Sequence, residues 1–468
     1  MPDLVTSKTF VDGEKGITAA KMNQIISGAV IQPAFYSAKP STSTLDPTDV
    51  LLDLKGSGSF AQITGAQIAS SVAGQLVLAD ATQNGMLRQV SGLATDVVDG
   101  TNHCVPIASM AGITQMRLRS FNALGNSVFE IDQRNIGNAL TNPANGSFIQ
   151  DRWSVFKSAG LTGTVNTALQ LVPTAPIVIP GTSFAITQAY QKFTVGTAQA
   201  SLAAADFWGI SQTIEGPRWR ELSMDVHSVS ILVQSSVART FALRLRDPTS
   251  THSLVTLCTV PANVWTLITL PNFPVWVGTY TASPGNAGYI FDIFLACGSN
   301  YLTAANAAWQ TGDVRGVTGM SNFLATSGAT FSIAFTQHEP GALCTTPQDL
   351  PFNHNLDDCL RYYQKSYNYA VLPGTASNPG RRTFLVLGAF AAGSGVMSFY
   401  KPMAKVPTVV LFNHATGAAS SVRDGAGVDH SSASASIIGE TGFDTIGFTT
   451  AVTSAMQIYT HYIADTGW

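Results

Sequence analysis

The chain has 468 residues, and at about 150 residues per domain this length predicts roughly three domains. Only 11% of the residues are charged, against about 25% in typical soluble domains, and the formal net charge is -3 with a sequence pI of about 6.2. There is no basic field and no cluster of five or more Lys or Arg residues, so we expect no nucleic-acid partner. No apolar stretch has the features of a signal peptide or a membrane span, so we expect synthesis in a cytoplasm and no membrane insertion.

Residues 1–35 are predicted to contain one short helix with Thr18 as its N-cap. Met22, Ile25 and Ile26 lie on one apolar face of this helix. Because a helix of about ten residues is marginal on its own, this face needs a partner. The partner is a copy of the chain or a larger assembly, unless the helix docks on its own domain.

Residues 36–110 are rich in small and polar residues and contain only short apolar pieces, such as VLLDL (50–54) and GQLVLAD (74–80). Turn pairs such as Asn84-Gly85 separate these pieces. Strands of this kind are too short and too polar to close a large core within one chain. We therefore predict a slender β-rich shaft in which several chains intertwine.

Residues 111–345 show the alternation that is typical of β-strands. In TFALRLRD (240–247), Phe241, Leu243 and Leu245 face one way and the two arginines face the other. Similar short runs recur with Gly, Pro and Asn between them. This pattern predicts a mainly β fold, with a β-jelly-roll sandwich as the largest domain.

Residues 346–468 begin with a break in this β pattern. In LDDCLRYYQKSYNYA (356–370), apolar and aromatic side chains recur at helical spacing from Leu356 to Tyr367, which predicts a short linking helix. Tyr363 lies on its apolar face and is expected to be buried. Strand-like runs return after the helix, which predicts a small C-terminal β-sandwich domain.

The cysteines and histidines are dispersed along the chain. The cysteines include no Cys-x-x-Cys pair, which argues against a disulfide framework or a zinc site and favours buried free thiols. The histidines form neither a His-x-His pair nor an i, i+4 pair on a helix. We therefore expect no metal and no cofactor. The five cysteines are Cys104, Cys258, Cys297, Cys344 and Cys359.

The sequence contains none of the common catalytic signatures, such as GxSxG, HExxH or a phosphate-binding loop. A glycosidase is harder to exclude, because it needs only two carboxylates at a suitable distance, and the candidates are Asp424, Asp429, Glu440 and Asp444. We interpret these four as solvated loop carboxylates that form turns. No catalytic residue is assigned, and we expect no enzyme activity.

Aromatic and polar residues in loops rich in Gly, Asn and Ser are candidates for sugar binding. Sugar rings stack on Trp and Tyr faces, and their hydroxyl groups need polar partners. For each candidate alone, packing in a core or an interface is the alternative interpretation. As a set, the loops are where a binding site is expected. The candidate ligand-binding residues are Trp276, Tyr280, Tyr301, Trp309, Asn413, His414, Arg423, Asp424 and His430.

Five short stretches follow one another in a recognisable order: FEIDQRNIG (129–137), FIQDRWS (148–154), ISQTIEG (210–216), DDCLRYYQKSYNYA (357–370) and SFYKPMAKVPTVVLFN (398–413). Together they resemble the distal part of bacteriophage tail fibre and receptor-binding proteins, in which a jelly roll resembling carbohydrate-binding domains precedes a small C-terminal β domain. The opening TFVDGEKGITAAKMNQI (9–25) is similar to that of many phage appendage proteins. By this resemblance, the structural signature positions are Asp151, Arg152, Trp153, Arg361, Tyr362, Tyr363, Lys365, Ser366 and Tyr367.

The resemblance implies a homotrimer in the virion tail, synthesised in the cytoplasm of the host bacterium. Residues 1–35, through Met22, Ile25 and Ile26, would attach it to other phage tail or baseplate proteins. The partner at the other end would be a polysaccharide or a protein of the host cell surface. Two alternatives stay open: a capsid-attached head fibre or decoration protein, and a tail-spike polysaccharide depolymerase.

Overall fold

The computed structural model describes residues 121–172, 176–178, 185–186, 189–224, 226–347 and 351–468, together with the backbone of four short strands that precede them. The chain divides into two units, Met1–Met116 and Arg117–Trp468. In the first unit, β1 (Val50–Leu54) pairs with β2 (Phe60–Thr64), and β3 (Asp96–Val98) pairs with β4 (Cys104–Pro106), both antiparallel. The predicted helix in residues 1–35, with Met22, Ile25 and Ile26, lies outside the described residues, and the intertwined shaft stays a prediction.

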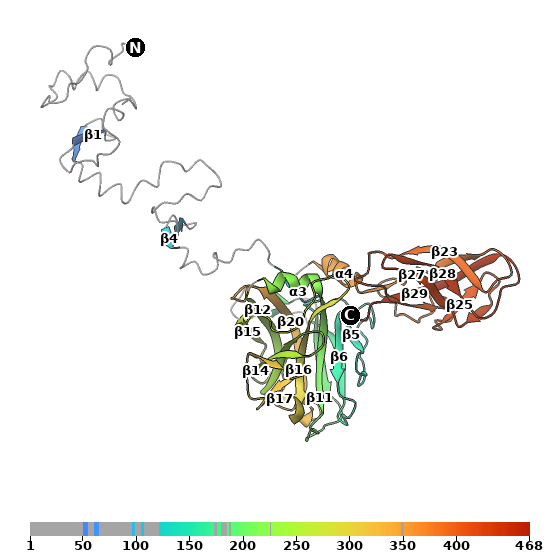
Figure 1. Cartoon of the computed structure of the whole chain (residues 1–468), viewed down its shortest axis with the longest axis horizontal. Coiled ribbons are helices and arrows are strands. Elements are labelled where there is room, and N and C mark those ends of the chain that lie inside the picture. The colour runs from blue at the N-terminus through green and yellow to red at the C-terminus, as the bar shows by residue number, and fades with distance from the viewer. Residues whose placement is uncertain are drawn as a thin grey trace, which may run out of the picture. The chain divides into compact units, whose positions relative to one another are not determined.

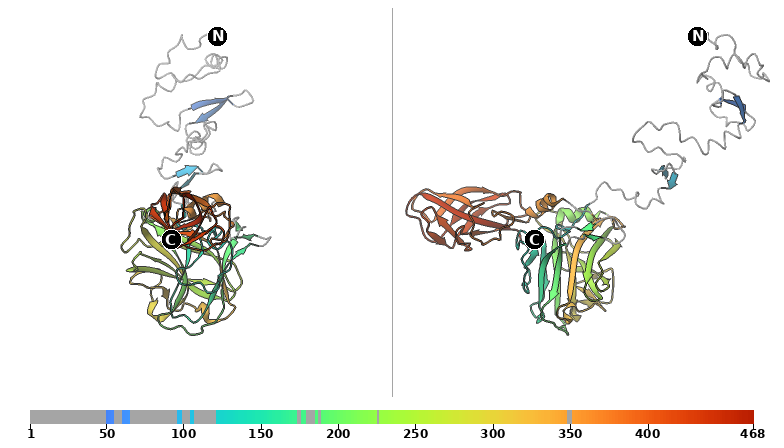
Figure 2. Two further views of the ribbon diagram at one scale, coloured as in Figure 1. Left: turned by 90° about the vertical axis from the view of Figure 1, so that its right-hand side faces the viewer. Right: turned by 180° about the vertical axis from the view of Figure 1, so that it is seen from behind.

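The second unit begins with a β-sandwich of two antiparallel sheets (Figure 1), which confirms the predicted mainly β jelly roll. Figure 2 shows the two layers from two further sides. The seven-stranded sheet has the order β18-β14-β13-β16-β11-β6-β5, and the five-stranded sheet the order β15-β12-β20-β10-β7. The strands of the first sheet are β5 (Phe148–Gln150), β6 (Trp153–Lys157), β11 (Phe207–Glu215), β13 (Arg239–Arg246), β14 (His252–Val260), β16 (Ala287–Cys297) and β18 (Ala308–Thr311). Those of the second are β7 (Val165–Leu171), β10 (Ala189–Val195), β12 (His227–Ser235), β15 (Thr266–Phe273) and β20 (Thr330–Pro340).

The hydrophobic core of the sandwich lies between the two sheets. On β13, Phe241, Leu243 and Leu245 all point into this core, as the alternation predicts. Arg244 points to the opposite face but is also fully buried, where it forms an ion pair of 2.7 Å with Asp292 on the neighbouring strand β16. The alternation of β13 therefore separates two buried environments, one apolar and one ionic.

Short elements cover the outer faces of both sheets. Phe207 and Phe294 of the seven-stranded sheet pack beneath Val317, and Phe335 of the five-stranded sheet packs with Ile177. Both outer faces are therefore largely withdrawn from water by the chain's own loops. The covering and connecting elements are β8 (Ile177–Val178), β9 (Ala185–Ile186), α3 (Gly216–Ser223), η3 (Ser299–Tyr301), β17 (Leu302–Thr303), β19 (Gly316–Val317) and η4 (Phe323–Ala325).

The linking helix is shorter than the sequence predicts and lies earlier in the chain. Helix α4 spans Phe352–Leu360, and β21 (Tyr363–Lys365) follows it directly. Tyr363 therefore lies on a strand, in register with Asp465 of β29 (Met456–Asp465). The helical spacing through Tyr367 was misleading, because pairing with β29 supplies the backbone hydrogen bonds that further helical turns would have made. Tyr363 is nevertheless only 3% exposed, so its predicted burial is confirmed.

The C-terminal domain is a small β-structure built around the long strand β29, which pairs with β21, β22, β24 and β25. Its core includes Phe384, Leu411, Phe443, Ile458 and Tyr462. The predicted small C-terminal β domain is thus present. Its other strands are β22 (Arg382–Val386), β23 (Ala392–Ser398), β24 (Thr408–Phe412), β25 (Ser421–Asp424), β26 (Asp429–Ser431), β27 (Ser434–Ile438) and β28 (Gly442–Gly447).

The cysteines of the described residues carry free thiols, as predicted. Cys258, Cys297 and Cys359 are buried and Cys344 is half-buried. Burial raises the pKa of the Cys258 thiol to about 12. These thiols are therefore neutral packing groups at ordinary pH. In the part of the chain that the structure describes, no helix has the length and apolar character needed to cross a membrane.

A chain of buried polar rings crosses the core at one end of the sandwich. The hydroxyl group of Tyr289 is 2.7 Å from Nδ1 of His338, whose Nε2 is 2.9 Å from Nδ1 of His227. All three residues are fully buried. Only one proton fits between the two facing imidazole nitrogens, so the two rings cannot both be cationic. Burial lowers the pKa of His227 to about 4 and places that of His338 well below its ordinary value.

We expect this histidine pair to make folding sensitive to acid. Between about pH 6.5 and pH 4 the unfolded chain binds a proton at His227 and the folded chain does not, so stability falls as the pH falls through this window. At about 1.4 kcal/mol per pKa unit, the loss from His227 alone is roughly 3 kcal/mol. Thermal unfolding between pH 7 and pH 4.5 measures it. The loss of stability should be smaller in His227→Gln and unchanged in His354→Gln, the control at an exposed histidine of α4. If stability falls equally with pH in the native chain and both variants, the acid sensitivity does not come from His227.

Candidate functional site

Three of the predicted sugar-binding residues come together in one aromatic cluster at the side of the sandwich. Trp276 lies 5.3 Å from Tyr280 and 5.7 Å from Trp309, measured between ring centroids. Trp219 of α3, which the sequence did not single out, stacks on Tyr280 at 5.0 Å with an interplanar angle of 12°. Loop, helix and strand β18 therefore each contribute rings to the cluster.

The rings of this cluster mostly contact one another and the sandwich core. One side of Trp276 is stacked against His227, at 4.6 Å between centroids, and all members of the cluster are half-buried. The hydroxyl group of Tyr280 donates to the carbonyl oxygen of Val277 at 2.8 Å. A sugar would need a free ring face. The contacts thus favour the packing interpretation for Trp276, and ligand binding by this group stays a prediction.

Tyr301 is not part of that cluster, because it lies over the outer face of the seven-stranded sheet. The guanidinium group of Arg315 lies 3.9 Å from the Tyr301 ring and 3.7 Å from the Phe207 ring, close enough for cation–π contacts with both. Asp313 accepts hydrogen bonds from Arg315. Tyr301 thereby helps to fix the covering loop onto the sheet.

The polar candidates of the C-terminal domain form two separate groups. In one, Asn413 donates to Oδ1 of Asp429 at 2.7 Å, and Nε of Arg423 donates to the same oxygen at 2.6 Å. Asn413 itself is fully buried, and its Oδ1 accepts from the backbone of its own turn. His414 contacts Asn378 at 3.0 Å. Only Arg423 and Asp429, with side chains 32% and 41% exposed, are open to a ligand.

The second group is the buried pair of Asp424 and His430 in the β25-β26 hairpin. Nε2 of His430 is 3.1 Å from Asp424 Oδ2, and the backbone N–H groups of Ala426 and Val428 donate to Asp424 Oδ1. Burial would raise the pKa of Asp424, but these hydrogen bonds hold it below its ordinary value. Asp424 thus forms a turn, as the interpretation from sequence expects, but it is wrong that this carboxylate is solvated, because Asp424 is only 5% exposed.

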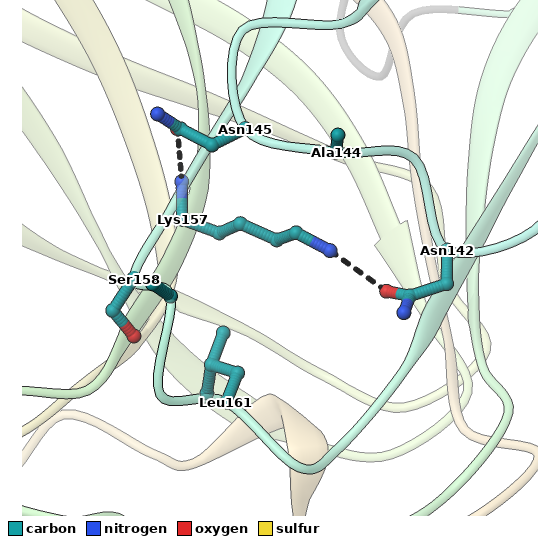
Figure 3. Close-up of a pocket in the computed structure, with 7 residues that line it drawn as sticks. Asn142, Ala144, Asn145, Lys157, Ser158 and Leu161 are labelled. Atoms are coloured by element: carbon teal, nitrogen blue, oxygen red, sulfur yellow. Dashed lines mark hydrogen bonds between the residues drawn. The ribbon is translucent and has the colours of Figure 1, made fainter.

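A polar cleft that sequence reasoning missed lies at the edge of the sandwich (Figure 3). Its volume is about 490 Å³, within the range of small-ligand sites. Lys157 projects from the end of β6 across the cleft, where its Nζ donates to Asn142 Oδ1 at 2.8 Å. The residues that line this edge cleft are Asn142, Ala144, Asn145, Lys157, Ser158, Ala159 and Leu161.

The edge cleft lies where the two sheets of the sandwich come close. Lys157 belongs to the seven-stranded sheet, whereas the backbone N–H of Asn142 donates to the side chain of Asn166 on β7 of the five-stranded sheet. The backbone N–H of Lys157 donates to Asn145 Oδ1 at 2.9 Å. No sequence signal marks this site, because its residues are common surface types that are brought together by the fold, from the loop before β5 and from the end of β6 with the loop that follows it.

Several signature positions of the resemblance, among them Arg152, Arg361 and Tyr362, lie at a buried joint between the sandwich and the C-terminal domain, whereas Trp153 lies in the sandwich core. Glu215, at the end of β11, accepts two hydrogen bonds from Arg361, at 2.6 and 2.8 Å, and one from the Tyr362 hydroxyl at 3.1 Å. The Arg152 guanidinium lies 3.6 Å above the Tyr362 ring. Burial would raise the pKa of Glu215, but the hydrogen bond from Arg361 and one from the Gly285 N–H keep it below the ordinary value.

A second set of contacts completes this joint beside Tyr363. Arg134 Nη2 donates to Asp465 at 3.0 Å, and the Arg134 guanidinium stacks on Tyr363 at 4.0 Å. The Nζ of Lys365 donates to three backbone carbonyl oxygens, including that of Gln133 at 2.9 Å. Burial lowers the pKa of Lys365 to about 8. Tyr362 is buried here as well, at 2% exposed.

Comparisons with known proteins give structural matches of low similarity. No family model matches the chain, and no curated protein matches it in sequence. The carbohydrate-binding module TmCBM61, solved with β-1,4-galactotriose, is 14% identical over 47% of this chain and 99% of its own, with a TM-score of 0.24. A family 11 carbohydrate-binding module of Clostridium thermocellum, with a mixed-linked tetrasaccharide, is 12% identical over 44% and 98%, with a TM-score of 0.24.

A third similar structure is the enzymatically active domain of tailspike protein 4 of bacteriophage CBA120. It is 11% identical over 47% of this chain and 21% of that chain, with a TM-score of 0.23. Scores of this size carry no argument about function. The jelly-roll assignment rests on the strand order of the two sheets.

We expect Tyr363→Ala to weaken folding. The substitution removes a ring that is 3% exposed and stacked under Arg134, and truncating a buried aromatic side chain costs about 3–5 kcal/mol. Urea unfolding followed by tryptophan fluorescence measures the loss. Tyr400→Ala, at a tyrosine that is 58% exposed, is the control and should change stability by less than about 1 kcal/mol. Equal stability of the two variants would contradict the burial of Tyr363 in solution.

Proposed function

We propose that this chain is a structural protein of a bacteriophage virion: a trimeric tail fibre that binds a glycan of the host cell surface during adsorption, without cleaving it. The sandwich and the C-terminal domain form its distal part. Residues 1–35 attach it to other tail proteins.

The observation that carries this proposal is the joint. The five stretches that resemble tail fibre proteins are far apart in the sequence, yet each contributes a contact there. Residues 129–137, 148–154 and 210–216 supply Arg134, Arg152 and Glu215 from the sandwich. Residues 357–370 and 398–413 supply Arg361 and Ala404, whose backbone N–H donates to the Arg361 carbonyl at 2.8 Å. Because residues from all five stretches meet in one structure, we interpret their order as the result of a shared architecture.

An apolar surface on the C-terminal domain supports the trimeric part of the proposal. Leu385 and Val396, on the adjacent strands β22 and β23, are 50% and 80% exposed, and Leu387 and Ile437 are 76% and 71% exposed. Leu385 belongs to a row that continues across the sheet through residues without charge: Leu385, Ser394, Thr445 and Ser436. Exposed large apolar side chains such as these can be buried when copies of the chain associate.

Weak individual sites suffice for the proposed adsorption. Three binding sites on one fibre raise the effective concentration for the second and third contacts. The low charge of the chain also suits this task, since a surface built on Ser, Thr and Asn offers the hydrogen-bonding groups that sugar hydroxyls require.

We expect the purified chain to bind bacterial surface polysaccharides. Binding should be detected on an array of capsular and lipopolysaccharide glycans, and the bound glycan should keep its chain length, with no new reducing ends. A chain that assembles correctly but binds no glycan on the array would contradict the adsorption role. New reducing ends would favour a depolymerase instead.

We expect the chain to have three times its monomer mass of 49.3 kDa in light scattering. Val396→Glu should reduce this to the monomer mass, because three like charges would be buried against one another. Val428→Glu is the matched control: this valine is 54% exposed but lies in the β25-β26 hairpin, outside the row through Leu385. If the native chain is a monomer, the trimeric part of the proposal is wrong. If Val396→Glu is still a trimer, the interface does not include Val396.

A further inference from the structure

The edge cleft is lined by hydrogen-bond donors and contains no carboxylate. The side-chain oxygens of Asn142 and Asn145 both accept from Lys157, which leaves their NH₂ groups without a partner among the described residues. Lys157 uses one of its three ammonium protons on Asn142, and the other two remain. A ligand in this cleft therefore meets several free donors that surround one positive charge.

Lys157 forms no ion pair with any residue that the structure describes. The acidic side chain nearest to the cleft wall is that of Asp206, and its oxygens are already used by Gln199 Nε2 at 2.7 Å, by the Ala203 N–H at 2.9 Å and by the Ser158 hydroxyl. Burial alone lowers the pKa of Lys157, with no contribution from a carboxylate. Its charge is thus partly desolvated and uncompensated within the chain.

The position of Lys157 in the cleft is fixed by the strand β6 and by its neighbours. Lys157 follows Trp153 and Val155 at two-residue intervals on β6, and those two side chains enter the core, so Lys157 occupies the next core-facing position at the rim of the sandwich. Leu161 packs against the same core and forms an apolar wall below the lysine. Asn142 and Asn145 hold both ends of Lys157 in place, as Figure 3 shows.

We propose that the edge cleft binds an acidic sugar residue, with its anionic group on Lys157, its hydroxyl groups on the Asn142 and Asn145 amides, and an apolar ring face against Leu161. This inference rests on the proposed glycan-binding function and names the class of glycan. The anionic group is the carboxylate of a uronic acid or a phosphate ester, since both present several acceptor oxygens to an ammonium group and two amides.

Two ligand pairs test the charge. Capsular polysaccharides that contain uronic acid are compared with the same polysaccharides after carboxyl reduction, which makes the sugar neutral and leaves its other hydroxyl groups in place. Polysaccharides that carry phosphate monoester groups are compared with the same polysaccharides after phosphatase treatment. We expect the acidic member of one pair to bind at least tenfold more tightly than its neutral counterpart, and the pair that shows this preference identifies the anionic group.

Variants at Lys157 test the site itself. Lys157→Met keeps the length of the side chain and removes the charge, so affinity for the acidic ligand should fall at least tenfold, whereas Lys157→Arg should keep most of it. Lys192→Met, at a lysine on β10 that does not line the cleft, is the matched control and should bind as the native chain does. Thermal unfolding of each variant shows whether a loss of binding comes from misfolding.

The outcomes separate this inference from the proposed function. Equal affinity for acidic and neutral ligands, or native affinity in a folded Lys157→Met variant, would overturn the edge cleft as an acidic-sugar site and leave glycan binding intact. A native chain that binds neither acidic nor neutral glycans would overturn both.

Discussion

The carboxylate of Glu215 connects the two β domains that the structure describes in the second unit. It lies at the end of a core strand of the sandwich and accepts hydrogen bonds from Arg361 and Tyr362, which directly follow helix α4. A carboxylate in such a place is costly unless it is fully paired, because it has lost its water. Here it is paired with one arginine and one tyrosine. Glu215 therefore helps to orient the first residues of the C-terminal domain, together with the contacts of Arg134, Arg152 and Lys365.

These contacts explain why the chain changes from helix to strand so abruptly. Arg361 and Tyr362 must both reach Glu215, and Tyr363 must enter the sheet beside β29. Another helical turn would point Tyr362 and Tyr363 about 100° apart around an axis instead of placing them on opposite faces of a strand. The spacing of Leu356 and Leu360 gave a correct helix, but a local pattern has no information about a partner strand a hundred residues later. The prediction failed at the residue where long-range pairing begins.

The sequence predicted correctly which way a side chain points, because neighbouring residues determine this. It did not predict contacts with residues that are distant in the chain. Alternation in β13 placed Phe241 correctly in the core, and it also placed Arg244 on the opposite face. It could not show that Arg244 is buried, because the covering loop and Asp292 come from later parts of the chain. The same limit applies to the candidate site. Trp276 was recognised as an aromatic residue in a loop, but the histidine that occupies one side of its ring lies on another strand.

The covering of both sheet faces restricts where a ligand can bind the sandwich. Short elements such as β8 and β19 pack over the two outer faces, so the ring and strand surfaces there already have protein partners. The rim of the sandwich remains open, because the last core-facing positions of the strands lie there and no further layer covers them. Lys157 occupies such a position on β6, one step beyond the buried Val155. In a chain with few charges, most arginines of the sandwich are paired or stacked within it, as Arg244 and Arg315 are. Lys157, which has no ion pair among the described residues, is therefore one position at the rim where a charge of this fold is not used for its own stability.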